Sequence, residues 1–89
     1  MEYEWDPAKA KVNLRKHRVS FADASLALED PRALTIADPD ASGEQRFVSL
    51  GSDPAGCVLV TVFAPRGLRT RIISSRKASR AERRAYESQ

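Results

Sequence analysis

The spacing of apolar residues changes at Asp30-Pro31, and this change constrains the fold more than any other feature of the sequence. Before it, apolar residues recur every three to four positions, as in helices that bury one face. After it come short runs of strand-forming residues separated by turns that contain glycine and proline, which favour antiparallel neighbours. Because 89 residues provide one core and no more, we predict a single α+β domain over residues 1–89.

Capping and turn residues predict the order of the elements. A short strand at residues 3–5 leads into Asp6-Pro7, which starts a first helix, and Ser20 caps a second helix after a very short connection. Four strands follow, at residues 33–37, 45–50, 57–64 and 68–75. Ser79 and Glu82 have the spacing of a capping box and predict a short final helix. The expected architecture is an antiparallel sheet with an N-terminal helical hairpin on one face and a short C-terminal helix.

The residues that the sequence lacks disfavour several classes of protein. Cys57 is the only cysteine, which excludes an internal disulfide and fits a reducing cytosol. The N-terminus has no signal peptide and no stretch approaches the roughly 20 apolar residues of a membrane span, so we expect a soluble, cytoplasmic protein. No cofactor or metal is expected, because the acidic residues cluster at turns and a helix end, where capping explains them. These residues are Asp30, Asp38, Asp40 and Glu44.

The most strongly charged segment is a basic strand that continues into the final helix. Strand alternation places Arg69 and Arg71 on one face and Thr70 and Ile72 on the other. Together with a net charge of +3, such a segment suits the phosphate backbone of a nucleic acid. An alternative is a solvated helix whose arginines pair with acidic neighbours such as Glu82. The candidate RNA-binding residues are Arg66, Arg69, Arg71, Arg80 and Arg83.

RNA can be cleaved without a cofactor, because its own 2′-hydroxyl can attack the adjacent phosphate. This reaction needs a proton acceptor, cations around the transition state and a proton donor for the leaving 5′-oxygen. Arginine suits the second task through bidentate contacts to phosphate. Arg76 and Lys77 lie where the basic strand meets the final helix, which favours anion binding. The candidate catalytic residues are Arg76, Lys77, His17, Glu44 and Arg46.

Structural roles remain open for three of these residues. His17 falls at the C-terminus of the first helix, where an imidazole can cap the last carbonyl groups. Glu44 and Arg46 are expected on one face of a strand, and they can simply pair across a turn.

The sequence resembles the BrnT family of toxins, through motifs that cover almost the whole chain in order. They are Glu4-Trp5-Asp6, Asn13-Leu-Arg-Lys-His17, Val19-Ser-Phe21, Asp30-Pro31, Gly43-Glu44-x-Arg46, Arg71-Ile-Ile-Ser-Ser-Arg-Lys-Ala78, Glu82-Arg83 and Tyr86. Two positions depart from the family pattern. Arg18 replaces the glycine that usually ends the first helix in a left-handed turn, at a cost of about 1 kcal/mol. Phe63-Ala64 replaces a tyrosine-threonine pair, so two hydroxyl groups are missing.

The resemblance implies the toxin of a type II toxin–antitoxin pair, with a RelE-like fold and metal-independent ribonuclease activity that restrains translation. It also implies a complex with a BrnA-like antitoxin that carries a ribbon-helix-helix part, so that DNA is bound only through the antitoxin. In this setting Arg69 and Arg71 are expected to line either an antitoxin groove or an RNA path.

Two further functions stay open at this stage. The chain can be a non-catalytic basic module or degenerate toxin that acts as co-repressor with a DNA-binding antitoxin, or it can bind RNA without cleaving it.

Overall fold

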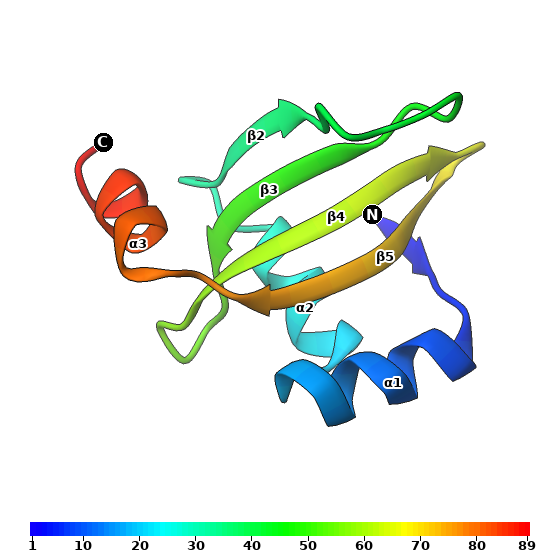
Figure 1. The fold of residues 1–89 in the computed structure, drawn as a ribbon, viewed down its shortest axis with the longest axis horizontal. Helices are drawn as coiled ribbons and strands as arrows, with labels where there is room; N and C mark the ends of the chain where they lie inside the picture. The colour runs from blue at the N-terminus through cyan, green and yellow to red at the C-terminus, as the bar shows by residue number, and fades with distance from the viewer.

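The computed structural model describes residues 1–89 and contains one five-stranded sheet and three helices (Figure 1). In chain order the elements are β1 (Glu2–Glu4), α1 (Pro7–His17), α2 (Phe21–Leu28), β2 (Leu34–Ala37), β3 (Phe47–Ser52), β4 (Val58–Arg66), β5 (Arg69–Lys77) and α3 (Arg80–Glu87). Every predicted strand and helix is present, with strand ends shifted by one or two residues. The strands lie side by side in the order β1-β5-β4-β3-β2.

The sheet is mixed, so the prediction of a wholly antiparallel sheet is wrong at one edge. The four strands from β2 to β5 are antiparallel neighbours, whereas β1 runs parallel to β5. This register places Glu2 opposite Arg69 and Glu4 opposite Arg71, with carboxylate–guanidinium distances of 3.8 and 3.1 Å. A strand of three residues has no alternation from which its partner could be predicted, and the charge pairs match this register.

Helix α2 packs across one face of the sheet, and helix α1 lies beside it along β5 (Figure 1). Helix α1 packs on β5, and α2 packs across β3, β4 and β5, so each helix has the sheet as its main packing partner. The buried residues Phe21 and Ala24 contact Ile72. Val19 and Ala27 contact Leu59 in a second cluster. The opposite sheet face has no helix across its centre and is called the open face below.

Local capping sets the starts of α1 and α2 where the sequence predicts them. The Asp6 carboxylate accepts a hydrogen bond from the Ala8 N–H at 2.9 Å, and the Ser20 hydroxyl accepts one from the Asp23 N–H at 3.0 Å. At the other end of α1, Arg18 has φ 60° and ψ 28°, which is the left-handed conformation that glycine adopts most readily. The expected left-handed turn is therefore confirmed, and a non-glycine residue occupies it.

Helix α3 begins with the predicted capping box, in which Ser79 and Glu82 each accept a backbone hydrogen bond from the other residue. Its far end is held by Tyr86, which is 8% exposed, donates its hydroxyl to the Asp30 carboxylate and lies 5.7 Å beneath the Arg32 guanidinium. None of the three helices is long and apolar enough to cross a membrane.

Candidate functional site

A pocket of about 460 Å³ lies where the C-terminal end of α1 meets the open face and the β2–β3 loop. We call it the site pocket. Its floor is apolar and consists of valines from β3 and β4, and its rim carries both cationic and acidic groups. The floor is formed by Val48, Val60 and Val62, and the polar rim by Lys16, His17, Asp38, Asp40, Ser74 and Arg76.

Asn13 fixes the end of α1 beside this pocket. Its side-chain amide donates to the Ser75 carbonyl at 2.8 Å and accepts from the Ser75 N–H at 3.1 Å, so it replaces the backbone of a neighbouring strand. The same amide donates to the Val19 carbonyl at 3.0 Å, and Asn13 is 6% exposed. Since His17 lies one helical turn after Asn13, these bonds carry the imidazole to the edge of β5. Sequence reasoning missed Asn13, although a polar residue on a packed helix face is an informative signal.

Arg76 projects from β5 at the rim and forms a bidentate ion pair with Glu82 of α3. The two terminal nitrogens of the guanidinium lie 2.8 and 2.9 Å from the carboxylate oxygens, which leaves Nε outside the pair. Hydrogen bonds from Arg76 and then from the Ser79 backbone lower the pKa of Glu82 to about 2, and the same pair raises the pKa of Arg76. Both partners are thus ionised at neutral pH.

Arg76 and Lys77 lie where β5 meets α3, as expected from the sequence, and they differ in their ion pairs. Both residues belong to β5, which extends to Lys77, and the charge of Arg76 is balanced by Glu82. The side chain of Lys77 is exposed and does not line the site pocket. The alternative that basic residues pair with acidic neighbours therefore holds for Arg76.

Glu44 and Arg46 do not share a strand face, because β3 begins at Phe47 and both residues precede it. Glu44 instead lies 3.4 Å from Arg66 on the exposed surface. Arg46 lies 3.8 Å from Asp38, and its carbonyl accepts a hydrogen bond from the Asp38 N–H at 2.8 Å. Arg46 therefore reaches the site pocket only through Asp38.

The candidate RNA-binding arginines are not gathered at the site pocket. Arg69 and Arg71 pair with glutamates of β1, and Arg66 pairs with Glu44. Arg80 and Arg83 are exposed on α3. Of the predicted site residues, the pocket brings together His17 and Arg76.

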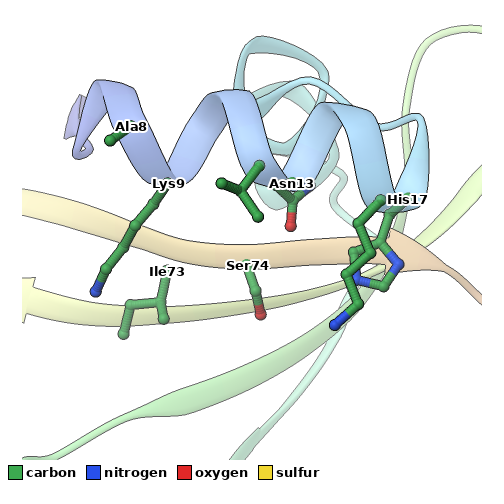
Figure 2. Close-up of a pocket in the computed structure, with 8 residues that line it drawn as sticks. Ala8, Lys9, Asn13, His17, Ile73 and Ser74 are labelled. Carbon is green, nitrogen blue, oxygen red and sulfur yellow. The ribbon is translucent and has the colours of Figure 1, made fainter.

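His17 is half-buried, and the C-terminal cap of α1 is made by the backbone N–H of Arg18, which donates to the Leu14 carbonyl at 2.9 Å. The backbone of Arg18, and not the imidazole of His17, therefore caps the C-terminal end of α1. The ring instead lies on the wall of the site pocket and of the groove beside it, and Figure 2 shows the ring in that groove.

Two aspartates of the pocket rim were assigned only to turn formation from the sequence. Asp38 does form a turn, since its carboxylate accepts a hydrogen bond from the Asp40 N–H at 2.9 Å. The fold places this turn across the pocket from Lys16 and Arg76. No local signal could have shown this, because the loop and α1 meet only through the assembled sheet.

The pocket combines the groups that acid–base chemistry on a phosphodiester requires. An imidazole and two carboxylates can carry protons, and a lysine and an arginine can stabilise negative charge on phosphate oxygens.

Comparison with known proteins agrees with this chemistry. Residues 5–82 match the family model described as ribonuclease toxin, BrnT, of type II toxin–antitoxin system. The chain is also similar to the crystal structure of the Brucella abortus ribonuclease toxin BrnT, with a TM-score of 0.67 and 26% sequence identity, over 90% of this chain and 99% of that one. No curated protein matches the sequence.

Proposed function

Because the chain belongs to the BrnT family of ribonuclease toxins of type II toxin–antitoxin systems, we propose that it is a metal-independent endoribonuclease that cleaves RNA in the site pocket. In this reaction the 2′-oxygen of a ribose attacks the adjacent phosphorus, and the bond from phosphorus to the 5′-oxygen breaks. The proton of the 2′-hydroxyl passes to a base, and another proton passes to the leaving oxygen. The products are a 2′,3′-cyclic phosphate and a 5′-hydroxyl.

The observation that carries this proposal is that His17 and Arg76 line one pocket although they belong to different elements. His17 serves as a proton carrier, and Arg76 binds a phosphate oxygen with the Nε edge that Glu82 leaves unused. Lys16 adds a second cation, and Asp38 is the carboxylate that can assist proton transfer. Arg46 positions Asp38 through the ion pair and the backbone hydrogen bond between them.

The side chains support a mechanism without a metal. No three histidine, cysteine, aspartate or glutamate side chains come together closely enough to hold an ion. RNA cleavage should persist in excess chelator, and 2′-O-methyl RNA and DNA should stay intact because neither has the nucleophile. Loss of activity that magnesium or zinc restores, or cleavage of either analogue, would refute the mechanism.

We further propose that this RelE-like domain, residues 1–89, acts in the cytoplasm, where RNA cleavage restrains translation until a BrnA-like antitoxin binds. Family membership supports an antitoxin partner. The open face supports a place for it, since Leu34, Ile36 and neighbouring apolar residues of β3 and β4 line a groove of about 230 Å³ there. Ile36 is 63% exposed, so a partner that covers it removes apolar surface from water. DNA would then be contacted through the antitoxin alone.

A non-catalytic co-repressor is the second candidate, and the pairing of Arg76 with Glu82 favours it because part of the cationic site is occupied. Expression of this chain alone separates the two. Growth arrest that the antitoxin relieves supports the enzyme. Unimpaired growth, together with intact binding to the antitoxin, supports the co-repressor.

A further inference from the structure

A second groove, of about 340 Å³, runs between α1 and the edge of β5 (Figure 2). We call it the α1/β5 groove. It is continuous with the site pocket, because Lys16, His17 and Ser74 line both. In Figure 2, Lys9 and Ile73 lie at one end of the groove and His17 lies at the other.

The groove exists because β5 lacks a strand partner along most of this edge. Strand β1 ends at Glu4, opposite Arg71, so the rest of β5 faces α1 instead. Asn13 holds α1 there through its two bonds to Ser75. The gap between a helix and an unpaired strand edge is open at Ile73 and Ser74.

Charge and shape indicate what the groove can bind. Lys9 and Lys16 are seven residues apart and lie on the same side of α1, which separates them by about 10 Å along the helix axis. Val12, which is 56% exposed, and Ile73 give the groove an apolar wall between the two lysines. None of the eight lining residues is acidic, whereas Arg66, Arg69 and Arg71 are all paired with glutamates.

Given the proposed RNA cleavage, we propose that the α1/β5 groove is a subsite for single-stranded RNA that binds the nucleotide next to the one held in the site pocket. Lys9 contacts a phosphate outside the scissile linkage, and Val12 and Ile73 contact the face of a base or its ribose. RNA fits better than an acidic peptide because one chain has to pass from this groove into the pocket that contains His17 and Arg76. The RNA path follows α1 and not the arginine strand.

The test compares Lys9→Ala with Lys11→Ala, which removes the same charge from the same helix. Lys11 lines a separate surface hollow with Leu14, Arg15 and Arg18. Binding of a labelled, non-cleavable 2′-O-methyl oligonucleotide is measured by fluorescence anisotropy over a range of salt concentrations, with circular dichroism as a check of folding. One phosphate contact to single-stranded RNA corresponds to a slope of about 0.7 in log affinity against log salt, or about fivefold in affinity at 0.1 M salt.

Lys9→Ala should therefore weaken binding about fivefold and reduce the salt slope by about 0.7, and Lys11→Ala should change neither. A dinucleoside monophosphate, whose only phosphate is the one at the scissile linkage, should bind wild-type protein and Lys9→Ala equally. Equal losses in both variants would mean general attraction to a basic helix and would overturn the subsite. A variant that weakens antitoxin binding but leaves RNA affinity unchanged would assign the groove to the partner.

Cleavage assays keep this inference distinct from the proposed function. If RNA is cleaved but Lys9→Ala and wild-type protein show the same dependence on RNA length, the subsite is refuted and the ribonuclease activity is supported. If RNA binds with the predicted dependence on Lys9 but is not cleaved, the subsite is supported and the ribonuclease activity is refuted. If no RNA binds at any salt concentration, both proposals are refuted.

Discussion

At the scale of residues, what distinguishes the basic side chains is whether each one forms an ion pair. Arg66, Arg69, Arg71 and Arg76 each pair with a glutamate. Local features are well predicted from sequence, because a cap such as Ser20 or Ser79 depends only on residues within four positions. The sequence left open whether the basic residues bind phosphate or pair with acidic neighbours. In the structure Arg76 pairs with Glu82, six residues further along the chain. His17 and Arg76 were both candidates from the sequence, and only the fold shows that they share a pocket.

Arg76 and Lys77 offer a matched pair for the site, since they are adjacent on β5 and only Arg76 lines the site pocket. Arg76→Ala should lower kcat for RNA cleavage by on the order of a hundredfold, as expected for loss of a group that stabilises transition-state charge. Lys77→Ala should change kcat by less than about threefold, since one exposed charge supplies mainly attraction. The test compares the cleavage rates of the two variants at saturating RNA and equal folded fraction. Equal losses of kcat in the two variants would place the catalytic cation elsewhere.

Arg18 stores local strain in its left-handed backbone. Arg18→Gly should relieve it, and after the greater freedom of glycine in the unfolded chain is subtracted, the free energy of unfolding should rise by up to about 0.5 kcal/mol. Urea unfolding measures this change. Arg18→Asn should give a smaller gain in the same direction, and a loss of stability in both variants would show that the Arg18 side chain makes a compensating contact.

At the scale of elements, α2 and α3 are attached to the sheet in different ways. Helix α2 approaches β3 so closely that a Cβ on Gly51 would lie 2.6 Å from the Ala27 carbonyl oxygen. Helix α3 is held by polar contacts at both ends, Arg76–Glu82 and Tyr86–Asp30. The existence of these helices could be predicted from capping signals. Their distances from the sheet could not, because they depend on residues such as Gly51 that lie far away in sequence.

Gly51→Ala should be more destabilising than a typical strand substitution. The added methyl group meets backbone that belongs to α2 and cannot move independently, so a loss of about 1–3 kcal/mol is expected. Chemical denaturation measures it, and Gly56→Ala is the comparison because a Cβ there meets nothing within 4 Å, although its φ of +91° adds backbone strain. A Gly51→Ala protein as stable as wild type would mean that α2 can shift away from the sheet at little cost.

The attachment of α3 should depend on pH through Glu82. Its pKa in the folded protein, about 2, lies below the ordinary value of 4.5, so its contribution to stability is present above pH 4.5 and is lost as the pH falls toward 2. The pair is partly exposed, which limits the effect to about 1 kcal/mol. Glu82→Gln preserves a capping-box side chain and should remove this portion of the acid sensitivity in urea unfolding between pH 5 and pH 2.5. The Asp30 carboxylate, whose pKa is lowered mainly by its bond from Tyr86, accounts for sensitivity that remains.

At the scale of the whole molecule, the site arises from segments that the chain brings together from both ends. The fold class and strand order along the sequence were accessible from periodicity and turns. The parallel pairing of β1 and the meeting of α1 with the β2–β3 loop were not, because neither has a local pattern. The open face also leaves an apolar groove that a partner can cover.

Antitoxin binding should therefore raise thermal stability strongly. A partner present at 100 times its dissociation constant adds about 2.7 kcal/mol, which for a domain of this size corresponds to a rise in Tm of roughly 10–20 °C. Differential scanning calorimetry of the free and bound protein measures it. Ile36→Asp, on the exposed rim of the apolar groove, should reduce the rise, whereas an unchanged rise would place the partner on another face.

The two bonds between Asn13 and Ser75 join residues 62 positions apart, and this distance has a consequence for biosynthesis. The imidazole of His17 is available early in translation, but its position against β5 is fixed only after Ser75 has left the ribosome. A fragment that ends before Ser75 lacks both this anchor for α1 and Arg76, so His17 has no pocket to line. If the proposed function is right, such fragments should not cleave RNA.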